Sequence, residues 1–300
     1  MPITAEQVRN LSTGLSAAYQ KGLGTVKPLH GAIATILSSS TSAEDYGFLG
    51  DWPEIKEWLG DRQLAKLAEH GYTIKNKKFE ASITVERDKV EDDQIGQYGL
   101  MAESIGQDVA VFPDKMVFSL LAAGFTTTCY DGQYFFDTDH PMAGGTASNI
   151  IANGNDSGGT PIPDGEAWFL LDCSRPLKPL VYQKRREFEF KSLDDMDSDH
   201  VVLNDEFIYA TDGRGNSGFG FWQMAVGSKA PLTKENLNKA RALLRSFTRD
   251  NGTPLGTKAT HLVVGGDNEA ASEELMMSNQ IAGTTNTLYK KFDLLVSEYL

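Results

Sequence analysis

Apolar and polar residues alternate along residues 79–86 with the period of two that is typical of a half-buried strand. The apolar positions are Phe79, Ala81, Ile83 and Val85. Asn76 and Lys77 precede this stretch and are typical turn residues, so residues 71–88 predict a two-stranded arm. Because a lone hairpin is barely stable in water, we expect the arm to rest on another surface.

Residues 97–124 carry the clearest helical period in the chain, with apolar side chains recurring every three or four positions. The stripe consists of Met101, Ile105, Val109, Phe112, Met116 and Leu120. A continuous helix of this length reaches about 40 Å. Pro113 lies inside the pattern and predicts either a kink or a division into two helices.

Further elements follow from shorter patterns. Helices are expected from Thr4 or Ala5 to Gly22–Gly24, at 51–60 behind the capping pair Asp51 and Glu54, at 232–247 and at 268–277. Strands are expected at 168–171, 180–185, 188–191, 207–210, 219–226, 260–264 and 294–296, and a long Gly- and Asn-rich loop at 144–165. This mixture, without an internal repeat, indicates an α+β fold.

Aromatic and acidic residues are interleaved at 45–61, just before the arm. Aromatic anchors dominate the energy of many protein interfaces, and lysines in the arm can meet carboxylates on a neighbour, contributing ~0–1 kcal/mol each while fixing register. The pattern therefore predicts that the chain binds copies of itself. The candidate inter-subunit contacts are Tyr46, Phe48, Trp52, Trp58, Tyr72, Lys75, Lys77 and Lys78.

Length and charge narrow the function classes. The 300 residues allow one large domain or two smaller ones, and the formal net charge of −13 disfavours a dedicated nucleic-acid-binding role. No apolar run approaches the roughly 20 residues that cross a bilayer, and no secretory signal is expected. Cys129 and Cys173 fit reduced thiols in a cytosolic protein better than a disulfide framework.

Two motifs suggest ligand binding and are interpreted otherwise. Residues 213–218 spell a dinucleotide fingerprint, but the sequence after them reads as strand, so a Gly-rich hairpin connection is expected. Asp195, Asp197, Asp199 and Glu206 have the spacing of a calcium loop, but His200 stands where that loop requires glycine, which favours a solvated acidic loop.

Asp137, Asp139 and His140 offer the alternative from a different class, a metal-dependent hydrolase. No second histidine lies nearby at a metal-binding spacing, and a turn stabilised by Asp139 is expected instead. Nucleophile and phosphate-loop motifs are absent from the sequence. The chain is therefore predicted to be no enzyme and to have no catalytic, cofactor-binding or metal-binding residue, while a monomeric carbohydrate-binding β module conflicts with the helical content.

Seven longer strings stand out in the chain: YGFLG at 46–50, EWLGDR at 57–62, HGYTIKNKKFE at 70–80, DGQYFFDTDHP at 131–141, LKPL at 177–180, GFGFWQ at 218–223 and GSKAPL at 227–232. Together they resemble the major head subunit of Mu-like phages and prophages. The similarity runs over nearly the whole chain. It implies a capsid protein of the HK97-like fold, with hexamers and pentamers that form an icosahedral head around double-stranded DNA without sequence-specific contact.

The resemblance also implies domain boundaries. Residues 1–43 would be an N-terminal arm, 44–80 an extended loop, 81–140 a peripheral domain with the spine helix at 97–124, and 141–300 mainly an axial domain. The strands expected at 168–226 depart from the usual order. Either the chain returns early to the peripheral sheet or the axial domain carries extra strands.

Partners and location follow from the same resemblance. A scaffold protein, a maturation protease and a portal would act during assembly, a decoration protein is compatible with it, and no membrane is involved. The protein would be part of the virion and be assembled in the cytoplasm of a bacterial host. An encapsulin-like cellular compartment shares the fold and is the alternative, while capsid size, triangulation number and covalent cross-linking stay open.

Overall fold

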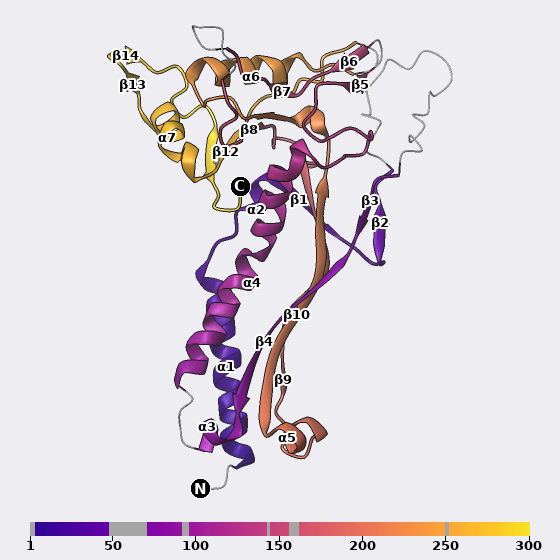
Figure 1. Cartoon of the computed structure of the whole chain (residues 1–300), viewed down its shortest axis with the longest axis vertical. Coiled ribbons are helices and arrows are strands. Elements are labelled where there is room, and N and C mark those ends of the chain that lie inside the picture. Colours follow the sequence, from indigo (N-terminus) through magenta and orange to yellow (C-terminus); the bar gives the residue numbers. More distant parts are fainter. Residues whose placement is uncertain (1–3, 48–70, 92–95, 143–144, 156–161, 250–251) are drawn as a thin grey trace.

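The computed structural model describes residues 4–47, 71–91, 96–142, 145–155, 162–249 and 252–300. The chain has a long, narrow lower part and a broader upper part (Figure 1). In the lower part, two helices lie beside a four-stranded sheet, whereas the upper part contains a second sheet with helices around it (Figure 1).

The lower sheet has the strand order β1-β9-β10-β4. Its strands are β1 (Ala34–Ser38), β9 (Leu180–Leu193), β10 (Glu206–Phe219) and β4 (Lys77–Glu86). β1 is parallel to β9, while β10 is antiparallel to both β9 and β4. Inward side chains alternate along β10, where Phe207, Tyr209 and Thr211 are buried, as the period of a one-sided sheet requires.

Helices α1 (Ala5–Thr25) and α4 (Gly96–Ala122) pack against each other and cover the inner face of the sheet (Figure 1). α1 begins with a capping box between Thr4 and Gln7. α4 continues through Pro113, so the predicted helix is not divided in two. The core between helices and sheet includes Val8, Leu11, Leu15, Ile83, Val85, Phe207 and Tyr209.

α1 and α4 approach so closely that glycine is required at the contact. A Cβ atom on Gly22 would lie 2.0 Å from the carbonyl oxygen of Glu103, and one on Gly106 would lie 2.2 Å from that of Tyr19. Both distances are far inside van der Waals contact with rigid helical backbone. The missing side chains therefore set the distance between the two helices.

The upper sheet has the order β15-β12-β8-β11-β7. Its strands are β7 (Ile150–Ile151), β8 (Trp168–Leu171), β11 (Ala225–Ser228), β12 (His261–Val264) and β15 (Asp293–Val296). All four residues of β8 are buried, which is typical of a strand covered on both faces. Helices α6 (Lys234–Ser246) and α7 (Glu269–Met277) belong to this part (Figure 1).

Shorter elements complete the described chain. The helices are α2 (His30–Ile33), α3 (Arg87–Glu91) and α5 (Asp199–Asn204), with 3₁₀ turns at Ala123–Phe125, Trp222–Met224 and Gly266–Asn268. Two-stranded pairs are β2 (Ala43–Asp45) with β3 (Thr73–Lys75), β5 (His140–Met142) with β6 (Gly145–Ala147), and β13 (Gln280–Ile281) with β14 (Thr284–Thr285). No helix among the described residues is long and apolar enough to cross a membrane.

The prediction of a self-paired arm at 71–88 is wrong. β3 pairs with β2, whereas β4 pairs along its whole length with β10. Local alternation reveals that a strand has a buried face, but it does not identify the neighbouring strand. The order of the later strands is settled as well, because β9 and β10 return the chain to the sheet that contains β1 and β4.

Four further expectations need correction. Residues 213–218 lie inside β10 and form no hairpin connection, and the expected strand at 219–226 is interrupted by the turn at Trp222–Met224. The expected loop at 144–165 contains β6 and β7. Asp199 opens helix α5 behind the cap Ser198, so the acidic loop that resembled a calcium site ends there in a helix. The helix expected at 51–60 lies outside the described residues.

Candidate inter-subunit contact surface

Residues on either side of 48–70 attach this segment to the lower sheet. The Tyr46 hydroxyl donates to Gln183 Oε1 at 2.7 Å, and the Gln183 amide donates to Ile74 O at 3.1 Å and to Asn76 Oδ1 at 2.8 Å. Gln183 is fully buried on β9. Burial and the negative charge of Glu44 raise the pKa of Tyr46 to about 12, so the phenol remains a hydrogen-bond donor at neutral pH.

Tyr72 belongs to the same group of anchoring residues, Tyr46, Tyr72 and Gln183, which we call the stem. Its hydroxyl accepts a hydrogen bond from the Phe219 backbone N–H at 3.0 Å, and burial raises the pKa of this phenol. The absence of a side chain at Gly218 leaves space for Ile74 and Tyr72 on β10. Tyr46 and Tyr72 thus make hydrogen bonds within their own subunit, and their contact with a neighbouring subunit stays a prediction.

The remaining candidates divide into two groups. Phe48, Trp52 and Trp58 lie outside the described residues. Lys75, Lys77 and Lys78 are exposed and have no ion pair among the described residues. Lys75 ends β3, whereas Lys77 and Lys78 begin β4, where they pair with Gly215 and Arg214 of β10.

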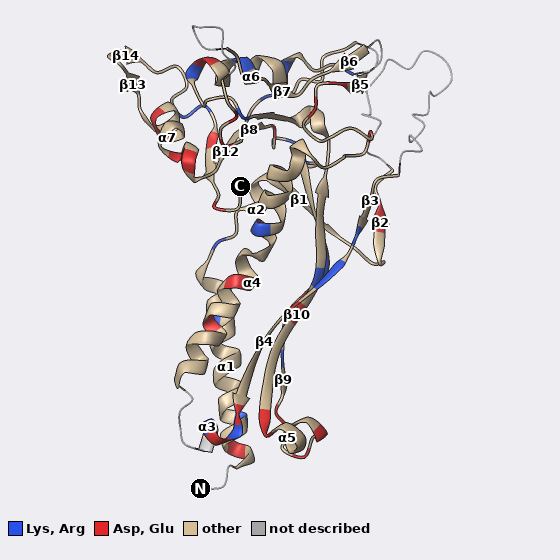
Figure 2. Cartoon of the chain, in the orientation of Figure 1, with Lys and Arg blue, Asp and Glu red and all other residues tan. Residues whose placement is uncertain are grey.

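Lys78 belongs to a basic row on the outer sheet face, the face away from α4. Register places Lys78 of β4 opposite Arg214 of β10, and Arg214 opposite Arg186 of β9. Figure 2 shows basic residues gathered where these strands cross. Like charges directly opposite one another destabilise a sheet. Neither Lys78 nor Arg214 has an ion pair in the described chain, and Arg214 Nε is buried without a hydrogen-bond partner there.

An acidic row lies further along the same face, two residues away on β4 and β10 and three on the bulged β9, a separation of about 7 Å at the strand rise of 3.4 Å per residue. It consists of Glu80, Asp212 and Glu189, which are also in register. Arg186 forms an ion pair with Asp212, and Lys191 Nζ lies 3.5 Å from the other Asp212 oxygen. Asp212 is therefore neutralised locally, while Lys78, Arg214 and Glu80 remain available to a partner.

Sequence reasoning missed Arg186 and Arg214. Arg214 stands inside the Gly-rich string that was interpreted as a connection, and the row becomes visible only from strand register. β9 and β10 also contain register shifts on either side of Arg214, so counting residues along each strand does not align them.

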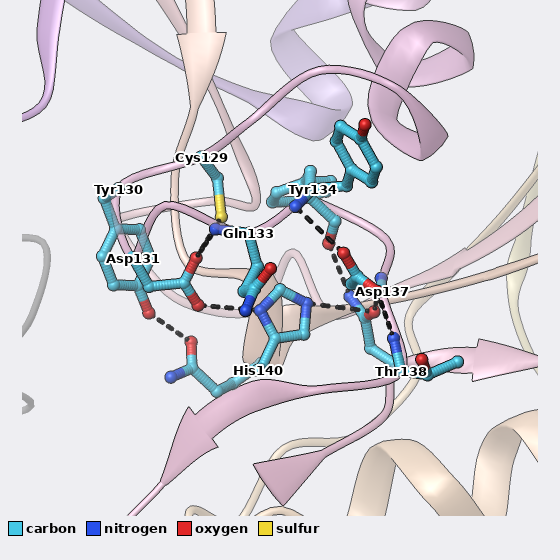
Figure 3. A network of polar contacts seen from close by, with 11 residues as sticks. Cys129, Tyr130, Asp131, Gln133, Tyr134, Asp137, Thr138 and His140 are labelled. Atoms are coloured by element: carbon cyan, nitrogen blue, oxygen red, sulfur yellow. Dashed lines mark hydrogen bonds and ion pairs between the residues drawn. The ribbon is translucent and has the colours of Figure 1, made fainter.

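The three residues of the hydrolase alternative do not converge on a metal. Asp137 accepts backbone hydrogen bonds from Tyr134 at 3.2 Å and Thr138 at 2.7 Å (Figure 3). His140 Nδ1 instead lies 2.7 Å from Asp131 Oδ2. Among the described residues, the group with metal-ligand spacing is Cys129, Asp131 and His140.

The side chains of that group are hydrogen-bonded to one another and to nearby backbone. Cys129 Sγ donates to Asp131 Oδ1 at 3.1 Å, and the Gln133 backbone N–H donates to the same oxygen at 3.1 Å. The His140 ring stacks on Trp222 with a centroid distance of 4.0 Å. Burial together with the charge of Asp131 raises the pKa of the Cys129 thiol far above its usual range, so this cysteine is a protonated donor and no nucleophile.

A pH dependence of stability follows from Asp131. Burial alone would raise the pKa of its carboxyl, but the hydrogen bonds from His140 and Cys129 and the charge of His140 hold it below the ordinary value. A carboxyl with a lowered folded pKa stabilises the protein above its unfolded pKa, about 3.9, and this contribution is lost as pH falls through the folded value. Asp131→Asn should therefore lower Tm most at pH 7, with a difference that shrinks below pH 4. A difference that is constant from pH 7 to pH 2 would contradict this account.

Comparison with known proteins identifies the family of this chain. The family model of the Mu-like prophage major head subunit gpT matches residues 8–300. The chain belongs to this family. It is 40% identical over 312 aligned residues to the major capsid protein of Escherichia phage Mu, with all of both chains covered. It is also 40% identical to the FluMu major head subunit of Haemophilus influenzae, covering 87% of this chain and 86% of that protein.

Solved structures agree with the sequence relatives. A chain from the procapsid of bacteriophage JBD30 has a TM-score of 0.84 and 36% identity, with 99% of this chain and 100% of that chain covered. A chain from the JBD30 capsid has a TM-score of 0.79 and 26% identity, with coverage of 100% and 99%. The protein is a major capsid subunit of the HK97-like fold and a component of the virion, and its family is structural, not enzymatic. The phage-head prediction is confirmed over the cellular compartment and the hydrolase.

Proposed function

We propose that copies of this chain form hexamers and pentamers that close an icosahedral head around double-stranded DNA. Head-to-tail contacts between identical subunits close into rings when the rotation between them is a fraction of a full turn. The observation that carries the proposal in this chain is the basic row, because two of its three cations have no anionic partner among the residues that the structure describes. A neighbouring copy, with many exposed carboxylates, supplies that anion.

The banded charge of the outer face favours a protein partner over DNA. A DNA backbone presents negative charge only, so it would meet repulsion from Glu80 and Glu189 about 7 Å beyond the basic row. A protein surface with both signs can match both rows. Lys78 and Arg214 thus pair with carboxylates of a neighbour, and Lys75 and Lys77 extend the positive charge toward the base of segment 48–70.

Segment 48–70 supplies the second kind of contact. Its aromatic residues Phe48, Trp52 and Trp58 lie on an adjacent subunit and contribute most of the apolar contact energy there. The stem formed by Tyr46, Tyr72 and Gln183 anchors the segment on its own subunit. Residues 1–43 serve as the N-terminal arm, residues 44–80 as the extended loop, the lower part as the peripheral domain, and most of the upper part as the axial domain.

Further partners belong to the same proposal. A scaffold protein, a maturation protease and a portal act while the head assembles in the bacterial cytoplasm. The JBD30 capsid has been solved decorated with minor capsid protein trimers, with a TM-score of 0.76 to this chain. By analogy, a decoration protein binds this chain on the outside of the head.

Electron microscopy of the purified chain tests assembly, with shells, tubes or sheets expected and single particles contradicting it. In the same assay Lys78→Glu should raise the concentration needed for assembly about tenfold at low salt, equivalent to about 1.4 kcal/mol per contact. The effect should fade near 1 M salt, where the Debye length is about 3 Å. Lys291→Glu, an exposed lysine in the upper part, is the matched control. Equal assembly of both variants at every salt concentration would remove the basic row from the contact.

A further inference from the structure

Three side chains with metal-binding atoms meet beside strand β5 in the upper part (Figures 1 and 3). The sulfur of Cys129, a carboxylate oxygen of Asp131 and a ring nitrogen of His140 all lie within 4.8 Å of one another. Ligand atoms of a tetrahedral zinc ion lie about 3.4–3.6 Å apart, given metal–ligand distances of about 2.0–2.3 Å. His140 Nδ1 lies 2.7 Å from Asp131 Oδ2, and Cys129 Sγ lies 3.1 Å from Asp131 Oδ1. Opening each pair by about 0.5 Å therefore makes room for one ion.

The group is buried and belongs in part to a turn that reaches the surface. The side chains of His140 and Asp131 are 0% and 8% exposed, and Cys129 is buried as well. Stacking of the His140 ring on Trp222 holds the orientation of the imidazole. Gly132 is exposed, and its backbone N–H donates to Cys129 O at 3.2 Å within the turn. The ligand atoms are thus positioned before an ion arrives, and the turn gives the ion a route from solvent.

The hydrogen bonds of Asn149 determine which ring nitrogen of His140 is a donor. Asn149 Nδ2 donates to Phe135 O at 2.8 Å, and Asn149 Oδ1 accepts from the Asp137 backbone N–H at 2.9 Å. His140 Nε2 lies 3.3 Å from the same Oδ1 and therefore donates to it. In a neutral imidazole, the lone pair of Nδ1 then faces Asp131 Oδ2 at 2.7 Å. Two facing electron-pair donors require a cation between them, which is either a proton or a metal ion.

The charges of the group match a divalent cation. Without a metal, the Cys129 thiol is neutral, and one proton between His140 and Asp131 balances the carboxylate. When a divalent ion binds, the thiol and His140 each release one proton to solvent, and the thiolate and the carboxylate balance the two charges of the metal. The buried group is therefore neutral in both states, so binding leaves no uncompensated buried charge. One sulfur, one imidazole nitrogen and one carboxylate oxygen favour zinc over magnesium or calcium.

We propose that Cys129, Asp131 and His140 bind one zinc ion, with water in the fourth position of the tetrahedron. Asn149 orients the His140 ring from the side away from the ion. The ion links the turn at 129–133 to β5 and stabilises the packing around Trp222. This role is structural and agrees with a family that is not enzymatic. The inference goes beyond the shell function and does not rest on it, because all of its ligands come from one subunit.

Zinc titration of the purified, tag-free chain after treatment with a chelator tests the proposal. Calorimetry should give one zinc ion per chain, with about two protons released at pH 7. Zinc at about a hundredfold excess over its Kd should raise Tm by about 5 °C. Magnesium chloride at the same concentration should leave Tm unchanged, because magnesium prefers oxygen ligands. An unchanged Tm with zinc, or an equal rise with magnesium, would overturn the proposed site.

Cys129→Ser separates metal binding from hydrogen bonding, because serine keeps a donor toward Asp131 but supplies no thiolate. The metal-free variant should stay folded, zinc should no longer raise its Tm, and cobalt(II) in place of zinc should lose its thiolate charge-transfer absorption. Cys173→Ser is the matched control, since Cys173 lies outside the group, and it should keep the wild-type responses. Equal responses of Cys129→Ser and the wild type would place the metal elsewhere and refute the site. If Cys129→Ser does not fold, the cobalt spectrum of the wild type decides, and a spectrum without thiolate absorption refutes the site.

Discussion

Gly106→Leu is expected to separate α1 from α4 and to lower the free energy of unfolding by about 3 kcal/mol. The new Cβ would lie 2.2 Å from the Tyr19 carbonyl oxygen and 3.0 Å from the Leu23 backbone nitrogen. Helical backbone cannot yield locally as a flexible side chain can, so the whole of α1 must shift. Thermal unfolding and limited proteolysis at Arg9 and Lys21 measure the two effects.

Gly14→Ala is the matched control for this prediction. A Cβ there meets open space within the same helix pair, and alanine improves helix propensity by up to ~1 kcal/mol over glycine. Its Tm should therefore equal or slightly exceed that of the wild type. A Gly106→Leu protein with wild-type Tm and a protected α1 would show that the close approach of the helices is not required.

Asp114→Ala is expected to destabilise the subunit by about 3 kcal/mol, because it leaves buried donors without an acceptor. The carboxylate accepts hydrogen bonds from Leu29 N at 2.8 Å, His30 N at 2.7 Å and His30 Nδ1 at 2.7 Å. Asp114 is only 6% exposed, so water cannot replace it freely. Denaturant unfolding measures the loss.

Asp108→Ala supplies the control, since Asp108 is an exposed acidic residue of the same helix. Its effect should stay within about 0.5 kcal/mol. The double variant Asp114→Ala/His30→Ala should lose less than the sum of its single variants, because the two side chains are in contact. Additive losses would show that the His30 contact contributes nothing of its own.

Elements with a strong internal period were predictable from sequence. The stripe on α4 predicted that helix nearly to its ends, and the strand expected at 168–171 is β8. The glycines of β10 led to a wrong prediction of a connection, because glycine is required there by packing against a neighbouring strand. A Cβ on Gly213 would lie 2.6 Å from the Phe188 ring, and one on Gly215 would lie 2.7 Å from Gln183 O. Close packing against β9, not a turn, explains why glycine stands there.

The contact surface was predictable only in part. Lys75, Lys77 and Lys78 are recognisable from sequence because an exposed basic cluster is unusual in a chain of net charge −13. Arg186 and Arg214 join Lys78 only through the pairing of strands far apart in sequence. The hydrogen bonds of Tyr46 to Gln183 and of Tyr72 to Phe219 were not predictable, because composition does not identify partners far apart in sequence.

β9 and β10 extend from the upper part of the molecule to α5 as one antiparallel pair (Figure 1). Each strand has 14 residues. At its upper end Phe219 stacks on Phe135 with a centroid distance of 4.3 Å. The pair therefore spans about 48 Å, and each degree of tilt at the upper end displaces the far end by about 0.8 Å. Small rotations of otherwise rigid subunits are thus sufficient to fit them to positions of unequal curvature in one shell.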